Sequence, residues 1–422
     1  MTPEEDTRPI LFRNAALFDP RRGELVLKRS LLVRGETVAE VGGPELVVED
    51  ARQVDLQGRT LMPGLIDCHV HVCAVTADLS ALPEWSPSYV AAGAGKVMRE
   101  MLGRGFTTVR DAAGADYGLA DAVEEGLFEG PRLVFCGKAL SQTGGHGDFR
   151  RRGRSVYDGC YCSPGLGRIC DGVAEVRRAA RDEIRRGASH IKLMLSGGVA
   201  SPTDRVDSRQ FSLEEIRAAV EEAENANLYV TGHAYTAPAI NRGLECGVRC
   251  IEHGNLMDES SVQLFRERDA FYVPTLATYS ALAEHGPEYG LPADSHRKVF
   301  DVLEAGLGAL EMAHRGGVRM AYGTDLLGGM HQYQLNEFRL RAQVQSPAEI
   351  LRSATLEGAR LLRMEGRIGE LVAGAYADLL VLEGDPVADI GVMADPGRHL
   401  RLVMKGGRVF RGELAAVGAA RG

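Results

Sequence analysis

Two histidines separated by a single residue, His69 and His71, are the first side chains whose type and spacing suit a chemical role. They follow the apolar residues 61–66, a run typical of a short buried strand. Side chains two residues apart in a strand point to the same face, so both imidazoles are expected on one side of the strand's carboxyl end. Two imidazoles placed in this way can bind one metal ion, and other parts of the chain must supply its remaining ligands.

Three more metal-binding side chains, His233, His253 and Asp325, stand at the ends of other strand-like segments. A fourth residue, Lys192, lies among apolar side chains, where an unpaired ammonium group would be costly to bury. The ammonium group has no lone pair, and lysine stays protonated at neutral pH because its ordinary pKa is about 10.4. Lys192 can therefore be a ligand only after carbon dioxide carboxylates its amine. The carbamate then has two anionic oxygens that suit a bridge between two cations.

Each of these residues alone has a structural interpretation, such as a hydrogen-bonded histidine or, for Asp325, a helix cap. The joint pattern favours a metal site, because suitable ligand types occur at five predicted strand ends. We keep the structural interpretation for five further histidines: His190, His285, His296, His314 and His399.

The elements that must position these residues alternate along the chain. Amphipathic stretches lie between most of the strand-like segments, and Ser212 with Glu215 and Ser346 with Glu349 have the spacing of capping boxes. This alternation predicts an α/β protein with a parallel (β/α)8 TIM barrel, in which the carboxyl ends of the strands converge. A doubly wound open sheet is the alternative, and no glycine fingerprint supports it. The predicted strands are residues 65–70, 106–111, 132–136, 190–195, 228–233, 249–253, 271–274 and 318–324.

Short strand-like segments separated by tight turns occupy both ends of the chain, and Gly406-Gly407 is typical of a two-residue hairpin turn. We therefore predict one β-sandwich domain built from residues 1–61 and 367–422, with the catalytic barrel, residues 62–366, inserted in it. The 422 residues are long enough for a barrel of about 250 residues and a smaller module.

The composition is that of a soluble globular protein. Apolar residues make up 45% and charged residues 25% of the chain. A net charge of −9 without a long basic run argues against nucleic acid, and the lack of an apolar run of about 18 residues argues against a membrane span. Residues 1–9 lack the apolar segment of a signal peptide, so a cytoplasmic location is expected.

One connection, residues 141–171, is far longer than the others and shows little periodicity. Loops of this length are usually functional or disordered, and its place after a barrel strand predicts a lid over the active site. It contains three of the eight cysteines, without a CxxC pair. We interpret all eight as free thiols in a reducing compartment, with a disulfide or a metal site in this connection as the alternative.

Seven short motifs carry a family resemblance: residues 63–71 (PGLIDCHVH), 105–111 (GFTTVRD), 141–147 (SQTGGHG), 191–198 (IKLMLSGG), 232–235 (GHAY), 251–254 (IEHG) and 322–325 (YGTD). In this combination the chain resembles the amidohydrolase superfamily. Within it, the chain is similar to the binuclear-metal dipeptidase- and prolidase-like group related to imidazolonepropionase, which includes ochratoxin-degrading amidohydrolases. Residues 374–379 (GAYADL) also resemble the family's return to its β domain, so the resemblance covers nearly the whole chain.

The resemblance implies two divalent metal ions, one bound by His69 and His71 and the other by His233 and His253. N6-carboxylated Lys192 would bridge them. Zinc is expected from the mixture of imidazole and oxygen ligands, with manganese or cobalt as alternatives. A lysine at this position marks the binuclear members, which disfavours imidazolonepropionases themselves and mononuclear deaminases.

The resemblance also implies that Asp325 binds the first ion and acts in the reaction. We expect a metal-bridged hydroxide to attack an amide carbonyl, while Asp325 accepts the proton of the water and delivers it to the leaving amine. His146 and Tyr235 are candidates for binding the substrate and its developing oxyanion. Loop stabilisation by His146 and helix-start packing of Tyr235 are the alternatives.

The expected substrate is a dipeptide or an N-acyl amino acid, including ochratoxin-type acyl-phenylalanine amides, cleaved by a carboxypeptidase- or dipeptidase-like metallopeptidase. Arginine suits a substrate carboxylate, and Arg150 is one of five candidates in the long connection, with Arg151, Arg152, Arg154 and Arg168. Gly198, Met330 and His331 lie in segments expected to line the pocket of the leaving group. The apolar character of residues 326–331 favours an apolar or aromatic leaving amino acid, although Asp204 and Asp207 leave a basic one open.

Other classes remain open at this point. The same metals would serve a cyclic-amide or lactone hydrolase, and a deaminase would release ammonia instead of an amino acid. A non-catalytic relative would be expected to have lost ligands, and none is missing. Relatives of this kind form homo-oligomers, so the resemblance also implies a homo-oligomer.

Overall fold

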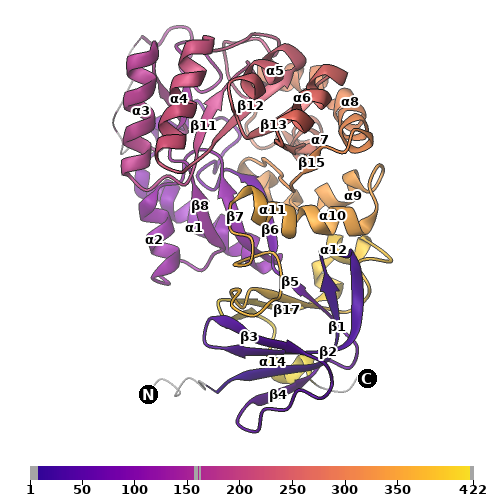
Figure 1. Cartoon of the computed structure of the whole chain (residues 1–422). Coiled ribbons are helices and arrows are strands. Elements are labelled where there is room, and N and C mark those ends of the chain that lie inside the picture. Colours follow the sequence, from indigo (N-terminus) through magenta and orange to yellow (C-terminus); the bar gives the residue numbers. More distant parts are fainter. Residues whose placement is uncertain (1–7, 156–159, 161–162, 419–422) are drawn as a thin grey trace. The chain divides into compact units, whose positions relative to one another are not determined.

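The computed structural model describes residues 8–155, 160 and 163–418 (Figure 1). The described chain divides into two compact units. The first draws its residues from Met1–Ile66, Met101–Thr108 and Gln345–Gly422, and the second from Asp67–Glu100 and Val109–Val344.

The first unit is built around an eight-stranded sheet that contains strands from both ends of the chain. Seven strands follow the order β18-β17-β16-β5-β1-β2-β3, and β4 pairs with β1. The early and late strands meet where β5 and β16 run antiparallel, with Pro63 opposite Leu379. The strand bounds are β1 Ile10–Asp19, β2 Glu24–Arg34, β3 Thr37–Gly42, β4 Arg52–Asp55, β5 Thr60–Pro63, β16 Leu379–Leu382, β17 Leu400–Lys405 and β18 Arg408–Arg411.

The hairpin predicted at Gly406-Gly407 is confirmed, because β17 and β18 pair antiparallel on either side of these glycines. Both have positive φ, 53° and 74°, as a two-residue turn of this kind requires. Gly407 also touches Gly35, and a Cβ on Gly407 would lie 2.0 Å from the Gly35 carbonyl oxygen. Only glycine fits the second position of this turn.

The second unit contains a seven-stranded sheet in which all neighbours are parallel, in the order β10-β9-β11-β12-β13-β14-β15. The predicted α/β class with a parallel sheet is therefore confirmed. A further three-stranded sheet has the order β6-β7-β8. The bounds are β6 Leu65–Val70, β7 Phe106–Asp111, β8 Arg132–Phe135, β9 Ala139–Ser141, β10 Gly167–Ile169, β11 Ile191–Met194, β12 Val230–Thr236, β13 Cys250–Leu256, β14 Phe271–Val273 and β15 Arg319–Met320.

Two backbone hydrogen bonds extend the pairing beyond these strands. After the short strand β15 the chain stays extended, and the carbonyl of Tyr322 accepts a bond of 2.7 Å from the amide of Cys68 in β6. Just before β11, the amide of Ser189 donates to the carbonyl of Phe135 in β8 at 2.9 Å. Both edge strands of the three-stranded sheet, β6 and β8, are thus hydrogen-bonded to segments that adjoin strands of the parallel sheet, one just after β15 and one just before β11.

Helices alternate with the parallel strands, as the periodicity predicts. The Ser212 and Ser346 capping boxes both form, each with its glutamate three residues later. No helix within the described ranges is long and apolar enough to cross a membrane. The helices are α1 Pro87–Gly103, α2 Tyr117–Glu124, α3 Val173–Arg185, α4 Leu213–Asn225, α5 Ala237–Glu245, α6 Glu259–Glu267, α7 Leu276–His285, α8 Ala293–Arg315, α9 Asn336–Arg341, α10 Pro347–Ser353, α11 Leu356–Leu361, α12 Gly391–Ala394, α13 Pro396–His399 and α14 Leu414–Val417, with 3-10 helices η1 Leu82–Glu84 and η2 Gly328–Tyr333.

The long connection at residues 141–171 differs from its prediction in two ways. It contains strand β10, which has only three residues. A strand this short shows no periodicity in the sequence, so it could not be predicted. Cys160 is disulfide-bonded, so the prediction of eight free thiols is wrong and the disulfide alternative holds for this residue. Residues 156–159 and 161–162, including Cys162, lie outside the described residues, and the lid stays a prediction. The free, buried thiols are Cys68, Cys73, Cys136, Cys170, Cys246 and Cys250.

Candidate metal centre and active site

The two-residue period of the strands separates core side chains from chemical ones. In β11, Ile191 and Leu193 belong to the apolar core shared with the helices, whereas Lys192 and Met194 line a cavity on the other face. His69 and His71 at the end of β6 line the same cavity. The strand alternation used to predict the pair of histidines therefore also explains how one strand can both pack and present a ligand.

The closest group of metal-binding atoms comes from His69, His71 and Asp325, all within 4.8 Å of one another. The two Nε2 atoms are 3.3 Å apart. Asp325 Oδ1 lies 3.3 Å from His69 Nε2 and 3.1 Å from His71 Nε2. Three ligand atoms converge here on a point that a divalent cation would occupy.

Hydrogen bonds on the far side of each ring assign the protons. His71 Nδ1 lies 2.9 Å from the carbonyl oxygen of Ala113, and His69 Nδ1 lies 2.7 Å from Glu252 Oε2. A carbonyl and a carboxylate can only accept, so each Nδ1 carries the hydrogen and each neutral ring has its lone pair on Nε2. The lone pairs thus face each other and Asp325, an arrangement that a bound cation would stabilise. This donor set fits a metal ion.

A second pair of imidazoles, His233 and His253, has ring centroids 4.6 Å apart. His233 Nε2 lies 3.1 Å from the carbonyl oxygen of Gly197, which leaves the lone pair on Nδ1. His253 Nδ1 lies 2.8 Å from Thr275 Oγ1. Burial is the main cause that lowers the pKa of both histidines well below the ordinary value, which favours the neutral form that binds metals.

Lys192 is 2% exposed, and its amine has no hydrogen bond or ion pair within the described part of the chain. Burial lowers the pKa of Lys192, partly opposed by the charge of Glu252. A lowered pKa increases the share of free amine, the form that reacts with carbon dioxide. A buried, unpartnered amine among metal-binding groups fits the predicted carbamate.

All six predicted metal ligands line one cavity, and His146 and Tyr235 line it with them. The structure therefore brings the predicted catalytic and metal-binding residues together. The rest of the wall is mostly apolar: Leu79, Ala113, Phe149, Leu166, Met194, Val199, Ala200, Thr278, Tyr279, Leu282 and Leu327.

His146 is positioned by its neighbours on both sides. Its ring stacks on His233 with centroids 4.1 Å apart, and its Nδ1 lies 2.8 Å from Ser201 Oγ, which in turn contacts the Asp204 carboxylate. Gly198 lies against the ring, where a Cβ would be 2.2 Å from the His146 ring carbon Cε1. The structure thus gives Gly198 a packing role beside His146, whereas we predicted it as a substrate contact.

The other predicted substrate residues do not line this cavity. Arg150 forms a two-bond ion pair with Asp148, at 2.8 and 2.6 Å, and lines a neighbouring cavity. Met330 is fully buried, and His331 Nε2 lies 3.2 Å from the carbonyl oxygen of Ala74. Three of the other four arginines that we named in the long connection pair with carboxylates as well: Arg151 with Asp78, Arg154 with Glu84, and Arg168 with Asp182 and Glu183.

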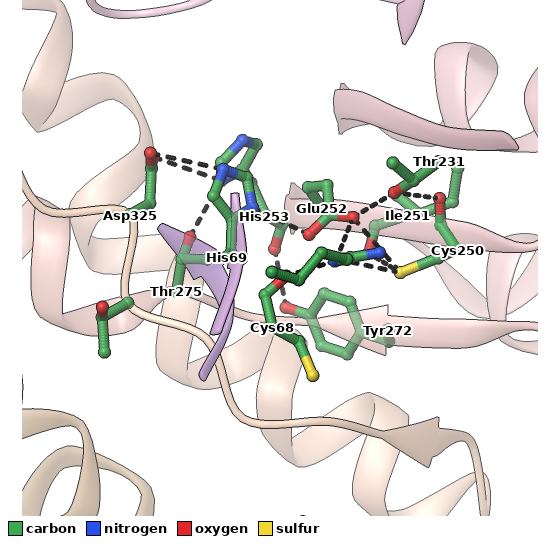
Figure 2. A network of polar contacts seen from close by, with 12 residues as sticks. Cys68, His69, Thr231, Cys250, Ile251, Glu252, His253, Tyr272, Thr275 and Asp325 are labelled. Carbon is green, nitrogen blue, oxygen red and sulfur yellow. Dashed lines mark hydrogen bonds and ion pairs between the residues drawn. The ribbon is translucent and has the colours of Figure 1, made fainter. Parts of the chain in front are cut away.

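A buried ion pair behind the metal ligands is absent from our predictions. Arg110 Nη2 donates to Glu252 Oε1 at 2.7 Å, both side chains have zero exposure, and the other Glu252 oxygen accepts from His69. Figure 2 shows Glu252 between His69 and Thr231. Burial alone would raise the pKa of Glu252, but the charge of Arg110 leads the effects that lower it well below the ordinary value. The signal in the sequence is an arginine within one predicted strand and a glutamate within another.

We predict that Glu252→Gln weakens metal binding. Glutamine can still accept the His69 hydrogen bond. It lacks the negative charge of Glu252, which strengthens that bond and pairs with Arg110. Changing the outer partner of a ligating histidine typically costs about 10–100-fold in metal affinity, and we expect a loss in this range for zinc in competition with a chelating dye. Thr231→Val, which also loses a Glu252 contact but leaves His69 untouched, is the matched control. Equal losses of zinc affinity in Glu252→Gln and Thr231→Val, with both variants folded, would contradict the role of the Glu252 charge in metal binding.

Comparisons with known proteins identify the family of this chain. The amidohydrolase family model matches residues 60–409. Ochratoxinase of Aspergillus niger is 34% identical over 420 residues, covering 94% of this chain and 86% of that protein. The crystal structure of a prolidase complexed with N-methylphosphonate-L-proline superposes with a TM-score of 0.93 at 47% identity, covering 96% of this chain and 100% of that chain. A Xaa-Pro dipeptidase structure with bound methionine gives 0.86 at 28% identity, covering 96% and 100%.

Members of this family normally bind a binuclear metal centre, and the His69, His71 and Asp325 cluster fits one half of it. The sequence motifs, the fold and the similar proteins all indicate the same family. The chain belongs to the amidohydrolase family and is a hydrolase that acts on amide bonds.

Proposed function

We propose that the protein is a metal-dependent amidohydrolase that releases an apolar or aromatic C-terminal amino acid from N-acyl amino acids or dipeptides. The observation that carries the proposal is the convergence of six metal-binding side chains in one cavity whose remaining wall is mostly apolar. The relatives named as an ochratoxinase, a prolidase and a Xaa-Pro dipeptidase support the same class of substrate. An acyl-phenylalanine amide of the ochratoxin type is included in this class.

We also propose that the strands of the second unit close into a (β/α)8 barrel. The bonds from Cys68 to Tyr322 and from Ser189 to Phe135 support closure, because they join the β6-β7-β8 sheet to the parallel sheet on both sides. The predicted division, with residues 1–61 and 367–422 as a β-sandwich domain and residues 62–366 as the catalytic barrel, is part of this proposal.

His69, His71 and Asp325 would hold one ion, His233 and His253 the other, and carboxylated Lys192 would lie between them. Zinc suits this mixture of nitrogen and oxygen ligands. When bound, the ions would polarise the substrate carbonyl and lower the pKa of the attacking water.

Asp325 would move the proton. Its carboxylate oxygen lies 3.3 Å from His69 Nε2 and 3.1 Å from His71 Nε2, and an ionised carboxylate in this position can accept a proton. It would take a proton from the attacking water and return it to the nitrogen of the leaving amine. Tyr235, with His146 nearby, would donate hydrogen bonds to the oxygen that becomes negative during attack.

We predict that Asp325→Asn lowers kcat by about 10³-fold or more while the protein retains most of its metal, because asparagine can still ligate through its oxygen but cannot accept the proton. Steady-state kinetics and metal analysis of the same preparation separate the two effects. Turnover near that of the wild type would rule out Asp325 as the proton carrier.

A panel of N-acyl amino acids and dipeptides tests the proposed substrate class. Compounds that share one acyl group and end in phenylalanine, leucine, proline, arginine or glutamate isolate the contribution of the leaving residue. We expect kcat/KM to be highest for the apolar and aromatic residues, because the wall around the metal ligands is mostly apolar. Release of ammonia, or cleavage of cyclic amides or lactones in place of every panel member, would contradict the proposal.

A further inference from the structure

Two tyrosines meet at the wall of the cavity. Tyr279 of α7 donates a hydrogen bond of 2.9 Å to the hydroxyl oxygen of Tyr235 in β12. Both rings are 2% exposed, and their centroids are 6.0 Å apart. Tyr279 is absent from our sequence predictions, because nothing in the local pattern of α7 distinguishes it from a core residue.

The Tyr235 oxygen accepts a hydrogen bond and keeps its own hydrogen for another partner. It receives the Tyr279 hydrogen at 2.9 Å. A phenol has one hydrogen to donate, and Tyr279 does not take it. Because Tyr235 lines the cavity that holds the metal ligands, that hydrogen is available to a substrate oxygen.

The neighbouring Thr275 contacts a predicted metal ligand. His253 Nδ1 lies 2.8 Å from Thr275 Oγ1, as Figure 2 shows. If His253 presents Nε2 to a metal, its Nδ1–H donates to Thr275. Thr275 precedes Tyr279 by one turn at the start of α7, so the same helix end supports both the histidine and the tyrosine pair.

The start of α7 explains why Thr275 is free for this role. Thr275 occupies the N-cap of the helix but makes no side-chain cap bond. Instead, the buried Glu337 accepts a hydrogen bond of 2.7 Å from the amide of Ala277 in the first turn. A carboxyl oxygen from another helix thus takes over the usual task of an N-cap threonine.

We propose that Tyr279 is a positioning residue, which directs the hydroxyl hydrogen of Tyr235 into the cavity toward the oxygen that gains negative charge when the amide is attacked. The inference rests on the proposed amide hydrolysis. The physical reason is that a hydroxyl group already oriented toward the oxygen does not have to reorient during the reaction.

The test uses Tyr279→Phe in the metal-loaded enzyme, which removes one hydroxyl and keeps the ring. We expect kcat to fall about tenfold with little change in KM, because misdirecting an oxyanion donor costs less than the about 10²–10³-fold loss on removing one. Affinity for a phosphonate analogue of the tetrahedral intermediate should fall by the same factor, while affinity for the free amino acid product stays unchanged. A merely structural role would not separate these two ligands.

A double-variant cycle shows whether Tyr279 acts through Tyr235. Once Tyr235→Phe has removed the hydroxyl, adding Tyr279→Phe should cost nothing more. Tyr322→Phe is the matched control, since it also loses a buried hydroxyl, which donates to the Gln334 carbonyl oxygen at 2.7 Å, and it should keep kcat. Additive losses, or a Tyr279→Phe enzyme with wild-type kcat and phosphonate affinity, would overturn the inference alone. A wild-type enzyme that neither cleaves amides nor binds the phosphonate would overturn the proposed function, and the inference with it.

Discussion

Electron-pair donors are crowded at the end of β6, and the surrounding residues of the site hold them there. Two imidazole nitrogens lie 3.3 Å apart, with a carboxylate oxygen of Asp325 within 3.3 Å of both. Such groups repel one another unless a cation lies among them. The fold holds them in place from behind, through Glu252 on His69 and the Ala113 carbonyl on His71. The buried charge of Arg110 serves this arrangement as well, because it keeps Glu252 ionised in an apolar interior.

Three of the ten described residues other than glycine that have positive φ lie at this site. His253, Thr275 and Asp325 have left-handed φ values of 72°, 50° and 54°, which residues other than glycine rarely adopt. Each such residue costs about 1–3 kcal/mol and persists only where its surroundings over-determine it. For Asp325 the determining contact is its own amide, which donates to the His69 carbonyl at 2.8 Å. The strand that presents the histidines therefore also fixes the loop that presents the aspartate.

The parts of this site that local physics determines could be predicted from the sequence. The strand predicted at residues 190–195 contains β11, which presents Lys192 on the face opposite the core, and the capping boxes predicted at Ser212 and Ser346 mark helix starts. What could not be predicted depends on contacts between distant residues. Glu252 is 183 positions from His69. Arg150 has the right chemistry to bind a substrate carboxylate, but its Nε and Nη2 atoms donate to the nearby Asp148, and no sequence pattern predicts that ion pair.

The proposed two-metal centre requires Lys192 as a ligand through its carbamate. Metal content per chain, measured by mass spectrometry on the wild type and on Lys192→Ala with and without a short carboxylic acid, shows whether it forms. We expect about two ions per chain in the wild type and a large loss in the variant, reversed when the acid takes the place of the carbamate. Metal well below one ion per chain in the wild type, or unchanged content in Lys192→Ala, would contradict it.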